Sequence, residues 1–85
     1  MTNRLFELIY ENVPEDNKNK IKYENINMDS EFFQDLGYDS ISFMGLLLSV
    51  EDEWEIPIIE GEQNYIFFSA ISVRDLCDAL NFLLN

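Results

Sequence analysis

A candidate site for covalent chemistry lies in residues 35–41, which have the sequence DLGYDSI. Gly37 predicts a turn, and this turn brings Ser40 to the first position of a long predicted helix. Backbone N–H groups at a helix start are unpaired and the helix dipole favours negative charge there, so a phosphate ester on Ser40 would be stabilised. A purely structural interpretation is also open, because Asp39 and Ser40 are residues that commonly cap helices.

The elements that would position this serine are helical. Apolar spacing predicts a helix over 3–12, a helix over 40–55 and a last helix that opens at Ser72. A single helical turn is expected over 65–68, and a long polar connection over 14–30. No strand pattern is evident. We therefore expect an all-α fold, a four-helix bundle with three main helices and one short helix, formed by all 85 residues as a single domain.

Capping residues mark two of the helix starts. Thr2 is the expected N-cap of the first helix, and Pro14 ends that helix. Ser72 and Asp75 are three residues apart, which is close to a capping box for the last helix.

The helix over 40–55 carries two groups of apolar residues. One stripe at helical spacing is expected to face the core: Phe43, Leu46, Leu47, Val50 and Trp54. A second group lies off this stripe: Ile41, Met44 and Leu48. These three residues either form an exposed surface for a partner or pack against the long connection or the short helix.

Acidic residues dominate the charge of the chain. Seventeen Asp and Glu stand against five Lys and Arg, which gives a net charge of −12, and histidine is absent. This balance argues against nucleic acids and anionic membranes as partners and favours a basic protein partner, although acidity alone also keeps a protein soluble. Without histidine, Ser-His-Asp and Cys-His catalysis are impossible, so we expect a protein that is not an enzyme.

The single cysteine, Cys77, excludes an intramolecular disulfide and is expected to fill the core. The longest uncharged stretches, 40–50 and 63–73, are too short to span a bilayer. The absence of a disulfide framework favours a reducing compartment, the cytoplasm. We also expect a free-standing protein and a monomer.

Residues 32–41, FFQDLGYDSI, resemble the phosphopantetheine attachment region of acyl and peptidyl carrier proteins, whose motif is Asp-Leu-Gly-x-Asp-Ser-Leu preceded by a Phe. Residues 50–58, VEDEWEIPI, and residues 71–76, ISVRDL, resemble later segments of that family. The resemblance implies that Ser40 carries a 4′-phosphopantetheine arm, which a phosphopantetheinyl transferase transfers from coenzyme A. It implies that the arm's thiol holds acyl or aminoacyl groups as thioesters for loading and condensing enzymes, while the domain itself catalyses nothing.

The resemblance also implies roles for neighbouring residues. Gly37 and Asp39 belong to the attachment site, and Asp39 helps to bind the transferase. The helix over 40–55 is the family's recognition helix, and its expected partner-binding residues are the following: Ile41, Met44, Leu48, Glu51 and Asp52.

The sequence departs from the family pattern after the serine. Fatty-acid carriers usually have acids two and five residues after it, where this chain has Ser42 and Gly45. We therefore expect a carrier of a polyketide or nonribosomal peptide pathway, with a fatty-acid-synthesis carrier as the alternative. An alternative of another class is an unmodified acidic helical adaptor that binds a basic partner. The segment 56–71 is longer than usual, and it is either a partner face or pocket or a tolerated surface insertion.

Overall fold

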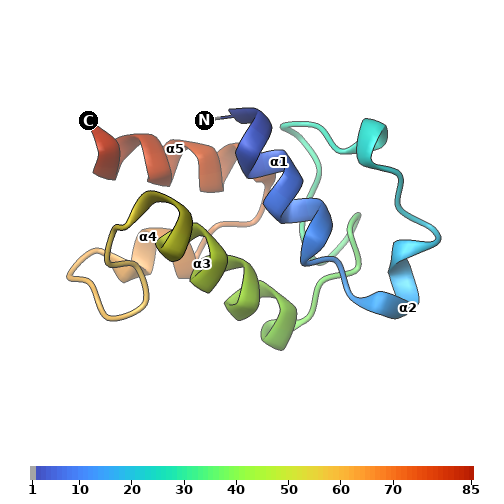
Figure 1. The fold of residues 1–85 in the computed structure, drawn as a ribbon, viewed down its shortest axis with the longest axis horizontal. Coiled ribbons are helices and arrows are strands. Elements are labelled where there is room, and N and C mark those ends of the chain that lie inside the picture. Colours follow the sequence, from blue (N-terminus) through green and yellow to red (C-terminus); the bar gives the residue numbers. More distant parts are fainter. Residues whose placement is uncertain (1) are drawn as a thin grey trace.

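Helices account for the regular structure of the computed structural model, which describes residues 2–85 (Figure 1). In chain order the elements are α1 (Thr2–Glu11), α2 (Glu15–Lys18), the 3-10 turn η1 (Tyr23–Asn25), α3 (Ser40–Trp54), α4 (Asn64–Phe68) and α5 (Val73–Leu84). Over the described range no strand forms, and an isolated antiparallel bridge joins Glu31 to Ser72. The expected all-α fold, with three long helices and the short α4, is confirmed.

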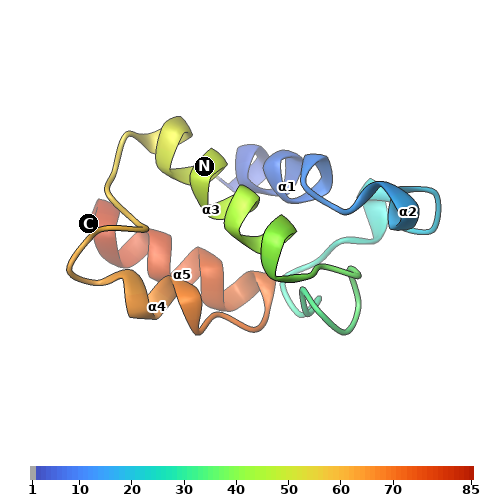
Figure 2. The same cartoon turned by 90° about the horizontal axis from the view of Figure 1, so that it is seen from below.

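One hydrophobic core holds these helices together. Helix α1 contacts α3, and α4 lies beside α5 (Figure 2). The largest fully buried side chains come from all parts of the chain: Leu5, Ile9, Phe32, Leu46, Leu47, Val50, Ile58, Phe67, Val73, Leu76 and Leu80. The predicted stripe of α3 is buried except for Trp54, which is half-buried at the end of the helix. Cys77 is buried, as expected.

The connection over 14–30 contains two short helical elements, α2 and η1, that the sequence pattern did not predict. Helix α2 follows Pro14 and has Glu15 and Asp16 in its first turn and Lys18 in its last. This order of charges complements the helix dipole and stabilises even a short helix. Thr2 lies inside α1 instead of capping it, so that expectation is wrong by one residue.

The boundaries of the other helices follow from their caps. The Ser72 hydroxyl accepts a bond from the Asp75 N–H at 3.2 Å, and the Asp75 carboxylate accepts from the Ser72 N–H at 3.1 Å. This confirms the capping box of α5, and the hydrogen bonds to its carboxylate lower the pKa of Asp75. Helix α3 ends at Trp54 because Glu55 adopts a left-handed conformation with φ of 53°.

Tyr38 links the end of α1 to the start of α3. Its buried ring packs edge-to-face against Phe32, and its hydroxyl donates a 2.6 Å bond to the Ile9 carbonyl. Near the end of α1 the Val13 N–H donates to the Tyr10 carbonyl, so the Ile9 carbonyl lacks its usual helical donor. The Tyr38 hydroxyl supplies that missing donor. Among residues 2–85, no helix is long and apolar enough to cross a membrane.

We predict that Tyr38→Phe lowers the free energy of unfolding by about 1–3 kcal/mol, because it removes the donor from a buried carbonyl. Urea denaturation followed by circular dichroism measures this loss. Tyr65→Phe is the matched control, since the Tyr65 side chain is 64% exposed and should tolerate the change. Equal stability of the two variants would contradict the proposed link between α1 and α3.

Candidate functional site

A tight turn immediately before α3 presents Ser40. Gly37 has φ of 70°, a left-handed conformation that glycine adopts without steric cost. The Tyr38 N–H then donates to the Phe32 carbonyl at 2.9 Å, which closes the turn. Buried Leu36 and Tyr38 fix the turn on both sides of the glycine, and Ser40 follows as the first helical residue with an exposed side chain.

Asn17 of α2 supports the Gly37 turn from outside, and sequence analysis missed this residue. Its Nδ2 donates to the Gly37 carbonyl at 3.2 Å. A Cβ atom at Gly37 would lie only 2.5 Å from that Nδ2. Position 37 therefore needs glycine for its backbone conformation and for its contact with α2. The sequence does not distinguish Asn17 from the other asparagines of the polar connection, so its role could not be predicted.

Asp39 caps α3. Its carboxylate accepts a 2.8 Å bond from the Ser42 N–H, and the Ser42 hydroxyl accepts a 2.9 Å bond from the Asp39 N–H. These bonds lower the pKa of Asp39, so its carboxylate stays ionised and bound to the first turn of the helix. The structural interpretation of Asp39 is therefore confirmed.

Ser40 differs from every other serine of the chain in its hydrogen bonding. The hydroxyls of the other five serines each form a hydrogen bond: Ser30, Ser42, Ser49, Ser69 and Ser72. Within residues 2–85 the Ser40 hydroxyl has no such partner, although it lies at the positive end of a 15-residue helix. Its oxygen is available for a new bond, and the helix dipole would favour an anionic group attached there.

The apolar residues predicted to lie off the core stripe of α3 are at the surface. Ile41 is 84% exposed, Leu48 is 53% exposed and Met44 is 39% exposed. The alternative that Ile41 and Leu48 pack against the connection or α4 is therefore wrong. These three residues, referred to below as the α3 face, leave apolar area available to another molecule.

The two acidic residues expected to bind partners lie in different environments. Glu51 is half-buried, and its carboxylate accepts a 2.8 Å bond from the Ile58 N–H, which holds the loop after α3 against that helix. Asp52 is exposed. Among residues 2–85, no group of His, Cys, Asp and Glu is arranged to hold a metal ion.

Gly45 faces α1. A Cβ atom there would lie 3.3 Å from the Asn12 Oδ1. The Asn12 Nδ2 in turn donates to the Leu8 carbonyl at 2.9 Å and to the Ser49 hydroxyl at 3.3 Å. Glycine at position 45 therefore allows the end of α1 to approach α3 closely.

We predict that Gly37→Ala destabilises the protein by at least about 1–2 kcal/mol, because alanine is strained in the left-handed conformation and its methyl group meets Asn17. Thermal unfolding measures the change. Gly45→Ala is the control, since its backbone conformation suits any residue and its new contact is longer. A loss for Gly37→Ala no larger than for Gly45→Ala would contradict this account of the turn.

Comparisons with known proteins cover most of the chain. The family model for the phosphopantetheine attachment site matches residues 19–80. The acyl carrier protein of Rickettsia bellii strain RML369-C is 31% identical over 68 residues, which cover 80% of this chain and 70% of that protein. The acyl carrier protein of Rickettsia bellii strain OSU 85-389 is 29% identical over 68 residues, which cover 80% of this chain and 74% of that protein. The resemblance found in the sequence is thus confirmed, and the chain belongs to the acyl carrier protein family, whose members carry 4′-phosphopantetheine on a serine and are carriers, not enzymes.

Proposed function

We propose that residues 1–85 form a single carrier domain and that Ser40 is the serine to which 4′-phosphopantetheine is attached. The observation that carries this proposal is the free hydroxyl. Ser40 is exposed, and of the six serines it alone has a hydroxyl without a hydrogen-bond partner in residues 2–85. The matched family range includes it.

The surroundings of Ser40 fit a group linked through phosphate. The helix dipole of α3 favours negative charge at this end, and α3 has no acidic residue in its first turn. The neighbouring Asp39 carboxylate is occupied by the Ser42 N–H. When bound, the group supplies a terminal thiol that holds acyl chains as thioesters.

In the attachment step, the Ser40 oxygen forms a bond to the phosphorus of the phosphopantetheine moiety of coenzyme A, the pyrophosphate bond breaks, and adenosine 3′,5′-bisphosphate leaves. The Ser40 hydroxyl must lose its proton in this step. Asp39 is a poor general base for this step, because its pKa is held below the ordinary range and its carboxylate is committed to the helix cap. The base is therefore supplied by the phosphopantetheinyl transferase. Asp39 helps to bind that transferase, and the Gly37 turn holds Ser40 at the surface where the transferase can reach it.

The α3 face is the proposed docking surface for loading and condensing enzymes. Ile41 lies next to Ser40, and Leu48 lies two turns further along the same helix. Asp52 adds an exposed charge at the far end of α3. Glu51 contributes only at the edge of this surface, because its carboxylate already binds the loop.

The chemistry of the α3 face supports a polyketide or nonribosomal peptide pathway over fatty-acid synthesis. Residues 40–50 of α3 contain no Asp or Glu. An enzyme that recognises a row of acidic side chains on this part of the helix would therefore bind this protein poorly. The fatty-acid carrier remains the alternative. A net charge of −12 and one buried cysteine are compatible with a cytoplasmic monomer.

We predict that incubation with coenzyme A and a broad-specificity phosphopantetheinyl transferase adds the mass of one phosphopantetheinyl group. Intact-mass spectrometry should detect this gain in the wild type and in Ser49→Ala, and no gain in Ser40→Ala. Ser49 is the control because it lies on the same helix with its hydroxyl bonded to Gly45. A gain that persists in Ser40→Ala would refute the assignment, and no gain in the wild type would favour the unmodified adaptor.

We predict that a fatty-acid malonyl transferase loads the modified protein poorly, while adenylating or polyketide-loading enzymes charge it. Ser42→Asp should raise malonyl loading and make it salt-dependent, because it adds an acid two residues after Ser40 and keeps a side-chain acceptor for the Asp39 N–H. A fatty-acid-synthesis carrier is the positive control. Efficient malonyl loading and elongation of the wild type by fatty-acid enzymes would contradict the pathway assignment.

A further inference from the structure

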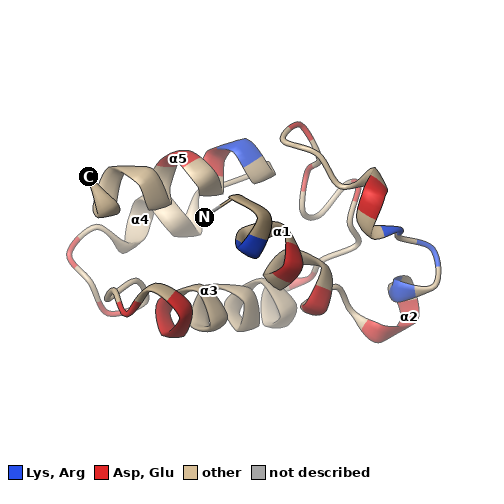
Figure 3. Cartoon of the chain, turned by 45° about the horizontal axis from the view of Figure 1, so that its top comes forward, with Lys and Arg blue, Asp and Glu red and all other residues tan. Residues whose placement is uncertain are grey.

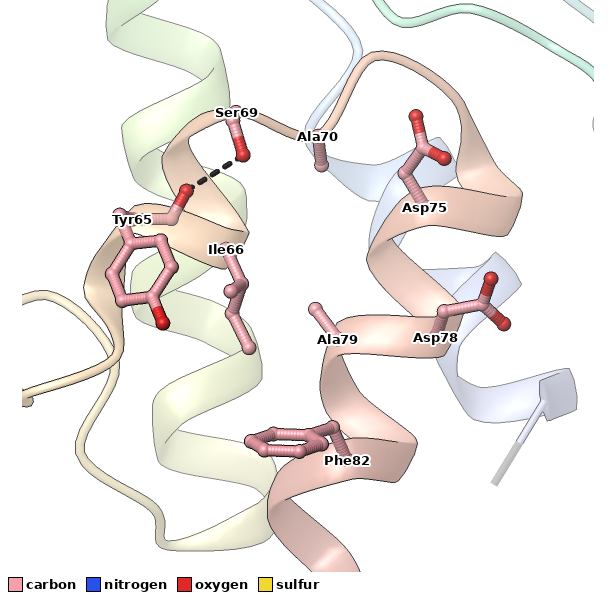
Figure 4. Close-up of a pocket in the computed structure, with 8 residues that line it drawn as sticks. All are labelled: Tyr65, Ile66, Ser69, Ala70, Asp75, Asp78, Ala79 and Phe82. Carbon is pink, nitrogen blue, oxygen red and sulfur yellow. Dashed lines mark hydrogen bonds between the residues drawn. The ribbon is translucent and has the colours of Figure 1, made fainter.

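A second apolar surface lies in the groove between α4 and α5 (Figure 4). Ile66 and Ala79 face each other across it, and the Tyr65 and Phe82 rings flank it. Its volume is about 650 Å³. None of the lining residues belongs to α3 or to the Gly37 turn, so the groove is separate from the proposed attachment site and its α3 face.

The exposure of the flanking rings identifies the kind of ligand that fits. Tyr65 is 64% exposed and Phe82 is 63% exposed, so both rings stand at the surface and do not enclose a small molecule. A polypeptide segment lying along the groove would cover both rings and the apolar floor between them. Aromatic side chains of this kind are the usual energetic centres of protein interfaces.

The charge around the groove indicates the sign of charge that a partner would carry. Asp75 and Asp78 line the α5 side, and no Lys or Arg lines the groove. The Asp75 carboxylate is bound to the α5 cap, whereas Asp78 has no hydrogen bond or ion pair within the described residues. Arg74, the nearest cation in sequence, is paired with Asp29 at 3.0 Å.

The distribution of charge over the molecule strengthens this conclusion. The loop that leads into α4 carries acidic residues, and the lysine-bearing segment 18–22 lies near α2 at the opposite end of the molecule (Figure 3). A basic segment is therefore attracted to the groove, and a second copy of this chain, with its net charge of −12, is repelled.

We propose that the groove between α4 and α5 docks a cationic amphipathic segment of a partner protein, with apolar side chains against Tyr65 and Phe82 and a Lys or Arg beside Asp78. This surface goes beyond the proposed carrier function, because its occupant binds without contact with Ser40. A partner held there leaves the α3 face free, so a carrier can stay tethered to one protein while Ser40 is presented to another.

The probe is a synthetic amphipathic helix of leucine and lysine, titrated into the 15N-labelled full chain and followed by NMR. A peptide of the same composition with a scrambled order, which has no apolar face, controls for general attraction to an acidic protein. We expect chemical-shift changes centred on residues of α4 and α5 that line the groove. We also expect the amphipathic peptide to bind more tightly than the scrambled one.

Variants of exposed residues separate the groove from the α3 face. Phe82→Ser should weaken binding of the amphipathic peptide by at least about fivefold, as loss of an interface aromatic does. Leu48→Ser, a change of similar exposure on α3, should leave binding unchanged, and so should Ser40→Ala. Tyr65→Ser is the second groove variant, should Phe82→Ser lose its dispersed spectrum. Asp78→Asn should reduce the salt dependence of binding.

Three results would overturn the proposal. The first is equal affinity for the two peptides, and the second is a set of shift changes centred on the α3 face. The third is a dimer that sedimentation detects in the wild type and not in Phe82→Ser, which would identify a second copy as the occupant. Because Ser40→Ala is included, each result is independent of whether Ser40 carries the prosthetic group.

Discussion

The position of Ser40 depends on the burial of Tyr38. The Tyr38 ring is almost fully enclosed, and its hydroxyl is bound to a carbonyl near the end of α1. The chain leaves the core at the next residue, Asp39, and Ser40 is also exposed. The buried Tyr38 side chain lies close to the Ser40 hydroxyl and orients the start of α3. The left-handed Gly37 allows the backbone to reverse between buried Leu36 and buried Tyr38. The Ser40 hydroxyl is thus exposed, while the turn before it is held by two buried side chains.

Several acidic side chains of the chain maintain the fold, whereas the Ser40 hydroxyl is left available. Asp39, Asp75 and Glu51 all use their carboxylates to bind backbone N–H groups. Loss of these carboxylates would leave backbone N–H groups without acceptors and would lower the stability of the fold. Ser40 directly follows Asp39 in the sequence, yet its hydroxyl forms no hydrogen bond within residues 2–85. A carrier needs this arrangement, because a hydroxyl already engaged in the fold would have to be released before modification.

Much of the fold could be predicted from the sequence, because its strongest signals are local. Helical apolar spacing gave α1, α3 and α5 to within one or two residues, and the capping box at Ser72 was visible as a pair three residues apart. The contacts that escaped prediction are between residues distant in sequence. Asn17 on Gly37, 20 residues away, depends on how the connection folds back. Glu51 binding to the Ile58 N–H depends on where the loop after α3 returns.

The close approach of α1 and α3 at Gly45 constrains how this carrier could change partners. The position at which fatty-acid carriers have their second acid faces Asn12, which is itself bonded to Leu8 and Ser49. A side chain there would require the Asn12 amide group to give way by a few tenths of an ångström. An acid at Ser42 would therefore leave α1 undisturbed, whereas an acid at Gly45 would also require the residue that follows α1 to yield space.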